Sequence, residues 1–144
     1  MYSINSVTIV GHLGADADIR AMQNGQKVAT LSIATDHSYK DKNTGDWVKR
    51  TEWHRVVTFQ PGLVSVLEKH ARKGRLTAVQ GMLRTRKWTD QNNIERYTTE
   101  IAVTPGCQIQ FLEKLDDRPA DDMPPQNDYA NYGGGADLDD DIPF

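Results

Sequence analysis

The sequence predicts a small all-β barrel with one helix, followed by an acidic tail, and three observations support this prediction. Segments of alternating apolar and polar residues recur through residues 1–115, with turn residues between them. A single segment instead has apolar residues at helical spacing. Residues 116–144 hold nine of the 20 acidic residues and one of the 17 basic ones, so this tail carries a net −8 and residues 1–115 a net +5.

Five segments have the composition of strands. Residues 27–35 show it most clearly, because Ala29, Leu31 and Ile33 alternate with polar neighbours. We expect Gly11 and Gly14 to end the first strand. The polar residues 42–46 are expected to form a hairpin tip, and residues 89–93 join the last two strands. The expected strands are residues 7–10, 27–35, 47–59, 75–88 and 94–104.

The helical segment lies between the third and fourth long strands. Leu63, Leu67 and Ala71 recur at every fourth position, which places them on one side of a helix. Pro61 suits the first helical turn, and Gly74 suits a position just past the helix end. One helix at this place among five strands is the arrangement of the OB-fold, a barrel that commonly binds oligonucleotides.

The tail, residues 116–144, contains four of the six prolines, a Gly133–Gly135 run and few apolar residues. Such a segment buries too little surface to offset its ordering entropy, so we expect it to be disordered. A purely solubilising role is the alternative. Apolar side chains at the end of an acidic run favour a partner-docking tip instead. The tip residues are Asp139, Asp140, Asp141, Ile142, Pro143 and Phe144.

Composition argues against several other classes of protein. Cys107 is the only cysteine, which rules out an internal disulfide and suits a reducing, cytoplasmic setting. The start of the chain has no signal-peptide pattern, and no apolar run approaches the roughly 20 residues of a membrane span. The four histidines are not spaced as metal ligands with Cys107, so neither a metal nor a cofactor is expected.

Two predicted strands each place aromatic rings and guanidinium groups on one face. Side chains in a strand alternate between faces, so residues of equal parity lie together. A core face would not contain arginines, and an ordinary solvent face rarely contains large rings. This combination suits single-stranded nucleic acid, whose unpaired bases stack on rings and whose phosphates attract cations. The residues are Trp53, Arg55 and Phe59 in the third strand and Arg84, Arg86 and Trp88 in the fourth.

Other residues near these strands are expected to extend the binding path. They are Tyr39, Lys42, Lys49 and Lys87. Trp47 suits a stacking role and an ordinary core or surface role equally well. His54 has the opposite parity to Trp53, so it is interpreted as a packing or subunit-contact residue rather than a ligand of the nucleic acid.

Several rival interpretations of these residues remain. A solvated edge strand that discourages aggregation is an alternative explanation of Arg84–Lys87, but that explanation leaves Trp88 unaccounted for. Asp16 and Asp18 are candidate metal ligands of a nuclease. Two further candidates are an RNA-binding or primosome-type OB protein and an adaptor that acts through its tail alone.

Long motifs in this order resemble the bacterial-type single-stranded DNA-binding proteins. The segments are residues 10–14 (Val-Gly-His-Leu-Gly), 51–57 (Thr-Glu-Trp-His-Arg-Val-Val), 72–74 (Arg-Lys-Gly), 83–90 (Leu-Arg-Thr-Arg-Lys-Trp-Thr-Asp), 96–100 (Arg-Tyr-Thr-Thr-Glu) and 139–144. The resemblance implies a non-enzymatic homotetramer around which single-stranded DNA wraps. It also implies base stacking by Trp53, Phe59 and Trp88 and a tetramer contact at His54.

The same resemblance implies a nucleoid-associated protein whose acidic tip docks replication, recombination and repair proteins. The chain departs from the family pattern at His12, where Asn is common, at Ala17, where Pro is common, and at Tyr39, where the aromatic is often tryptophan. The family therefore predicts weaker stacking at Tyr39.

Overall fold

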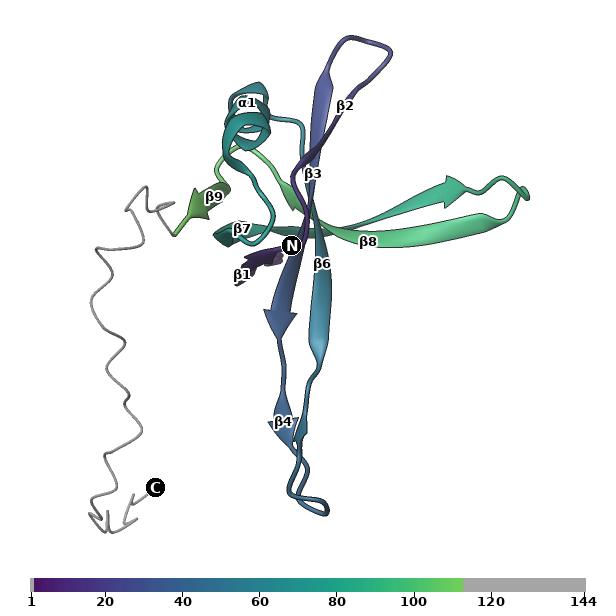
Figure 1. Cartoon of the computed structure of the whole chain (residues 1–144). Helices are drawn as coiled ribbons and strands as arrows, with labels where there is room; N and C mark the ends of the chain where they lie inside the picture. The colour runs from purple at the N-terminus through teal and green to yellow at the C-terminus, as the bar shows by residue number, and fades with distance from the viewer. Residues whose placement is uncertain (1, 113–144) are drawn as a thin grey trace, which may run out of the picture. The chain divides into compact units, whose positions relative to one another are not determined.

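The computed structural model describes residues 2–112, in which nine strands and one helix form a barrel with three projecting hairpins (Figure 1). The predictions for the tail and its tip, residues 139–144, lie outside the described residues. The strands are β1 (Val7–Leu13), β2 (Asp18–Ala21), β3 (Lys27–Asp36), β4 (Tyr39–Lys40), β5 (Trp47–Val48), β6 (Thr51–Thr58), β7 (Leu76–Thr89), β8 (Glu95–Val103) and β9 (Gln108–Phe111); the helix is α1 (Pro61–His70).

Five strands close into the barrel in the order β1-β3-β6-β8-β7, and β7 pairs back to β1. Strands β6 and β8 run parallel, while the other pairs are antiparallel. The predicted five-stranded OB-fold with one helix is therefore confirmed. Figure 1 shows the β2–β3, β4–β5 and β7–β8 hairpins extending from the barrel in different directions.

The core lies between the inner faces of these strands and α1. The alternation predicted for β3 is confirmed, because Ala29, Leu31 and Ile33 are buried. Val64 and Leu67 lie on the inner side of α1 and are buried against this core. Burying a side chain of this size contributes about 1.5–3 kcal/mol, so the predicted stripe is what attaches the helix.

The ends of α1 follow the predicted signals in part. Pro61 is the first helical residue, and the basic residues Lys69 and His70 occupy the last turn, where cations complement the helix dipole. Gly74, however, does not directly follow the helix. It lies in the next turn with φ of +84°, a conformation that favours glycine.

The boundaries of several strands differ from the prediction. Gly11 does not end β1, because the missing side chain lets β1 continue close to β3. A Cβ atom at Gly11 would lie 2.2 Å from the carbonyl oxygen of Ala34. The predicted strand 47–59 is divided into β5 and β6, with Phe59 just past the end. Strands β2, β4 and β9 were not predicted, since two to four residues are too short to show a period.

No helix in the described part of the chain has the length and apolarity that crossing a membrane requires.

Candidate functional site

Strand β8 joins the two rows of ring and guanidinium side chains into one surface. It pairs with β6 on one edge and with β7 on the other. In this register Arg84 lies opposite Glu100, and Trp88 lies opposite Arg96. Residues paired across two strands point to the same face, so the pairing of Val57 with Ala102 places the odd-numbered side chains of β6 on the face of Glu100. We call this surface the ring–arginine face, and its members are Trp53, Arg55, Phe59, Arg84, Arg86 and Trp88.

The rings of this face are accessible but held in place. Trp53 is 61% exposed and Trp88 40% exposed. The indole Nε1 of Trp88 donates a hydrogen bond to Thr98 Oγ1 at 2.8 Å. Trp53 covers Gly14, where an added Cβ would lie 2.3 Å from the indole Cζ3. The ring of Phe59 is partly buried, and the guanidinium of Arg84 lies 5.7 Å from its centroid, within cation–π range.

One buried carboxylate organises the three arginines of the face. The Glu100 side chain is 1% exposed and accepts a hydrogen bond from Arg84 Nη2 at 2.7 Å. The Nε atoms of Arg55 and Arg86 each lie 3.4 Å from its Oε2. Burial by itself would raise the pKa of Glu100, but hydrogen bonds from Arg84 and Arg86 outweigh it and hold the pKa below its ordinary value. Glu100 is therefore ionised at neutral pH.

The arginines keep charge and surface available after this pairing. Three guanidinium groups face one carboxylate, and each arginine side chain remains nearly half exposed. They line a groove of about 240 Å³ together with Phe59. Residues of β2 and β3, including Arg20, complete the groove on its other side. The groove thus presents fixed positive charge beside an aromatic ring, which suits an anionic ligand with flat apolar groups.

The remaining predicted ligands lie farther out. Lys49 is exposed next to β5, and Lys42 is exposed in the turn between β4 and β5. Lys87 has the opposite parity to Trp88, and its Nζ lies 2.7 Å from Glu95 Oε1. Tyr39 is 49% exposed on β4. The structure does not bring these residues onto the ring–arginine face itself, and their binding roles stay predictions.

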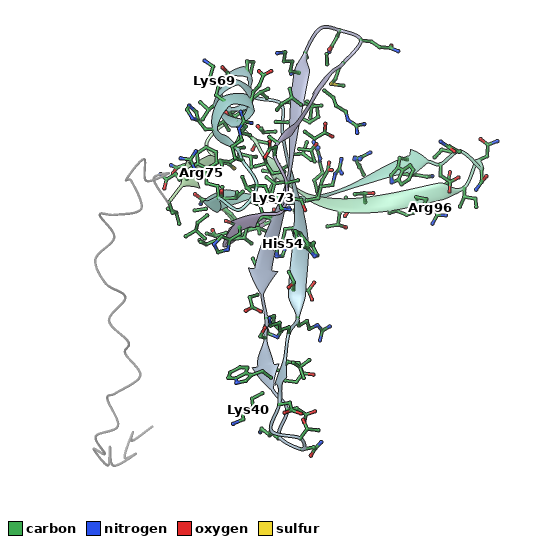
Figure 2. The ribbon with its side chains drawn as sticks, in the orientation of Figure 1. Lys40, His54, Lys69, Lys73, Arg75 and Arg96 are labelled. Atoms are coloured by element: carbon green, nitrogen blue, oxygen red, sulfur yellow. The ribbon has the colours of Figure 1, made fainter. Side chains whose placement is uncertain are left out.

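His54 lies on the opposite side of β6 from Trp53, as its parity predicted. Its Nε2 is 2.8 Å from Thr35 Oγ1 in a hydrogen bond. His54 lines a second groove with the apolar residues Val7, Ile9, Leu83 and Ile101, and Trp53, Arg55 and Glu100 line the same groove. Figure 2 shows His54 beside the barrel, away from the tips of the hairpins.

Asp16 and Asp18, the candidate metal ligands of a nuclease, have structural partners. Asp16 Oδ1 accepts a hydrogen bond from the backbone nitrogen of Lys73 at 2.8 Å, and its Oδ2 lies 3.8 Å from Arg72. Asp18 pairs with Arg20 at 3.1 Å. Among residues 2–112, no three His, Cys, Asp or Glu side chains gather as a metal site would require. These contacts favour a structural role for both aspartates.

The sequence interpretation missed three residues that position the face. They are Gly14, Thr98 and Glu100. Glu100 carried a usable signal, because it is an isolated charge directly before the apolar run 101–103 and has the parity of a face that already contains arginine. Gly14 and Thr98 carried none, since their roles depend on which strand lies beside them.

Comparisons with known proteins agree with this geometry. Residues 4–112 match the model of the single-strand binding protein family. A curated "Single-stranded DNA-binding protein" of Rhizobium meliloti (strain 1021) is 40% identical over 134 residues, which cover 93% of this chain and 76% of the relative. A solved structure described as "Plasmodium falciparum SSB complex with ssDNA" superposes with a TM-score of 0.70 at 37% identity, covering 78% of this chain and 98% of that one.

Proposed function

Because the chain belongs to the single-strand binding protein family, we propose that it binds and protects single-stranded DNA without sequence specificity. The observation that carries this proposal is the ring–arginine face, in which exposed rings alternate with arginines held by one carboxylate. Stacking of a base on an aromatic ring contributes about 1–3 kcal/mol and depends little on base identity. Arginines on the same face contact phosphates and release counterions, so binding should weaken as salt rises.

Tryptophan fluorescence gives the direct test of this function. All three tryptophans of the chain lie on or near the proposed path, so titration with poly(dT) should quench their emission. Comparing the affinity for DNA with that for an RNA oligonucleotide of matched sequence distinguishes a DNA-binding from an RNA-binding protein, since the 2′-OH is the group that differs. Incubation of labelled strands with Mg²⁺ or Mn²⁺ tests for cleavage, and we expect none. Emission that poly(dT) leaves unchanged would overturn the proposal.

We predict that Gly14→Ala weakens DNA binding while the barrel stays folded. The added methyl would lie 2.3 Å from the indole of Trp53, so the ring must move away. The loss should approach one stacking interaction, about 1–3 kcal/mol, in a titration against poly(dT). Gly11→Ala is the matched contrast. Its added methyl would lie 2.2 Å from the backbone oxygen of Ala34, so this variant should have a lower unfolding midpoint instead. Native affinity in Gly14→Ala would contradict this role.

We also propose that the protein assembles as a homotetramer with His54 at a subunit contact. Two features support this. Among the apolar side chains that line the groove beside His54, Leu83 is exposed and Val7 and Ile9 are partly exposed. Within the described chain, residues 7–11 of β1 pair along one edge only, and an open edge is a template for a second strand. Sedimentation equilibrium should give four times the 16.2 kDa chain mass, and a monomer would overturn the proposal.

A second arm of the proposed function is recruitment of replication, recombination and repair proteins by the acidic tip. Its chemistry suits a partner pocket that takes Ile142 and Phe144 and has a basic rim, because buried anchors dominate such contacts and rim charges mainly affect association.

Deleting Phe144 is predicted to abolish partner capture while leaving affinity for poly(dT) unchanged. Pull-down of replication and repair enzymes measures the first quantity, and fluorescence titration the second. A variant in which Asp128 is replaced by asparagine, outside the tip, serves as a control and should capture partners normally. Normal capture by the Phe144-deleted chain would show that the tip is not the docking element.

A further inference from the structure

Trp47 is the most exposed tryptophan of the chain. It lies on β5, and 70% of its surface is accessible, against 61% for Trp53 and 40% for Trp88. Covering a large exposed ring by a binding partner is favourable, because burying its apolar surface lowers the free energy. Trp47 belongs neither to the barrel core nor to the ring–arginine face, so neither of these explains its role.

The hairpin register determines the side of the ribbon on which Trp47 lies. Trp53 pairs with Ala34, and the same register continues outward without an extra residue. The backbone nitrogen of His37 donates to Arg50 O at 2.7 Å, and that of Asp41 donates to Asp46 O at 2.9 Å.

Between these two bonds, Tyr39 pairs with Val48 and Lys40 with Trp47. No bulge interrupts the alternation of side chains, so Trp47 lies on the same side of the ribbon as Trp53. Tyr39 lies on the other side.

The immediate neighbours of Trp47 are cationic. Lys40 is its direct cross-strand partner, and opposed side chains in such a pair are within contact range. Lys49 lies between Trp47 and Trp53 on the same side. Figure 2 places Lys40 near the end of the β4–β5 hairpin, far from Arg96 on the β7–β8 hairpin. A ring flanked by lysines repeats, at the end of the ribbon, the pattern of the ring–arginine face.

We propose that Trp47 stacks on a base of the same DNA strand that occupies the ring–arginine face, with Lys40 contacting an adjacent phosphate. This inference rests on the proposed function and extends it. Trp53 is six positions after Trp47, which at about 3.3 Å per residue is roughly 20 Å along the ribbon. That span is several nucleotides, and it lies within the roughly 4–16 nucleotides that one OB-fold occupies.

A variant with a single tryptophan tests this contact directly. Trp53→Phe and Trp88→Phe together leave Trp47 as the only indole in the full-length chain, while both positions keep a ring. Anisotropy of a labelled poly(dT) strand reports occupancy independently of the protein's emission. We expect Trp47 emission to be quenched in step with occupancy. Full occupancy with unchanged emission would overturn this inference and leave the proposed function standing, whereas absence of occupancy would count against the proposed function.

Affinity of variants in the otherwise native chain gives the second readout. Trp47→Leu removes the ring from an exposed site and is expected to weaken poly(dT) binding at least about fivefold, the low end of one stacking interaction. His37→Ala, an exposed change on the other side of the same ribbon, is the control and should keep native affinity. If Trp47→Leu keeps native affinity but changes the sedimentation mass, the ring contacts another copy of the chain and the inference is wrong.

Discussion

Replacing Trp53 and Trp88 together by alanine should weaken binding to poly(dT) by at least about 30-fold. Each ring removed costs one stacking interaction of about 1–3 kcal/mol, and every 1.4 kcal/mol corresponds to a factor of about ten. The two rings lie on separate strands and have separate supports, Gly14 for one and Thr98 for the other, so their losses should be nearly additive. Two of the three indoles are removed and the emission of native and variant proteins is no longer comparable, so anisotropy of a labelled strand is the appropriate measurement.

The matched control for this double variant is Tyr97→Ala. Tyr97 is 69% exposed on β8, in the hairpin that carries Trp88, but its parity places it on the opposite side. It should therefore keep native DNA affinity, provided that its sedimentation mass is unchanged. Equal losses in Tyr97→Ala and the double variant would mean that any exposed ring matters, and the ring–arginine face would lose its special role.

Replacing Glu100 by glutamine should lower the free energy of unfolding by about 1–3 kcal/mol, because the buried negative charge is lost and one of the two oxygens that accept from arginines becomes an NH2 group. The arginines themselves are nearly half exposed, and this solvation keeps the loss below that of a fully buried ion pair. Urea denaturation at fixed protein concentration measures the change. Glu95→Gln is the control, since Glu95 is a 61% exposed carboxylate on the same strand and its pair with Lys87 should contribute little.

The effect of Glu100 should depend on pH in one direction. Its pKa is lower in the folded protein than the ordinary value of 4.5, so the unfolded chain binds more protons as the pH falls below 4.5. The stabilisation by Glu100 is therefore fully present above pH 4.5 and is lost as the pH falls through the folded-state pKa. The native protein should lose more stability over this range than Glu100→Gln. Parallel pH profiles for the two proteins would contradict the proposed role of the carboxylate.

Much of the barrel could be predicted from the sequence because apolar residues recur with a clear period along its long strands and its helix. Strand β3 alternates through ten residues, and α1 has both an apolar stripe and a proline at its start. Gly11 shows the limit of local patterns. A glycine after an apolar run is typical of a strand end, but Gly11 lies inside β1, at a point where β1 closely approaches β3. That approach is a contact between distant segments, and no window of sequence contains it.

The same distinction applies to the candidate site. Parity along β6 and β7 was sufficient to group the rings with the arginines. It gave no information on which strand lies between them, and so the role of Glu100 on β8 was not found. The positions of Tyr39 and Trp47 required the register of the β4–β5 hairpin, which depends on the absence of a bulge over residues 37–50.

The hydrogen bond from Trp88 to Thr98 has a consequence for how quickly a strand can be taken up. Ordering a free side chain on association costs about 0.5–1.5 kcal/mol, and a ring already oriented avoids that cost. The arginines gathered on Glu100 are oriented in the same way. Under the proposed function, an incoming strand meets side chains that are already oriented, so its capture should depend on diffusion and charge attraction rather than on rearrangement of the protein.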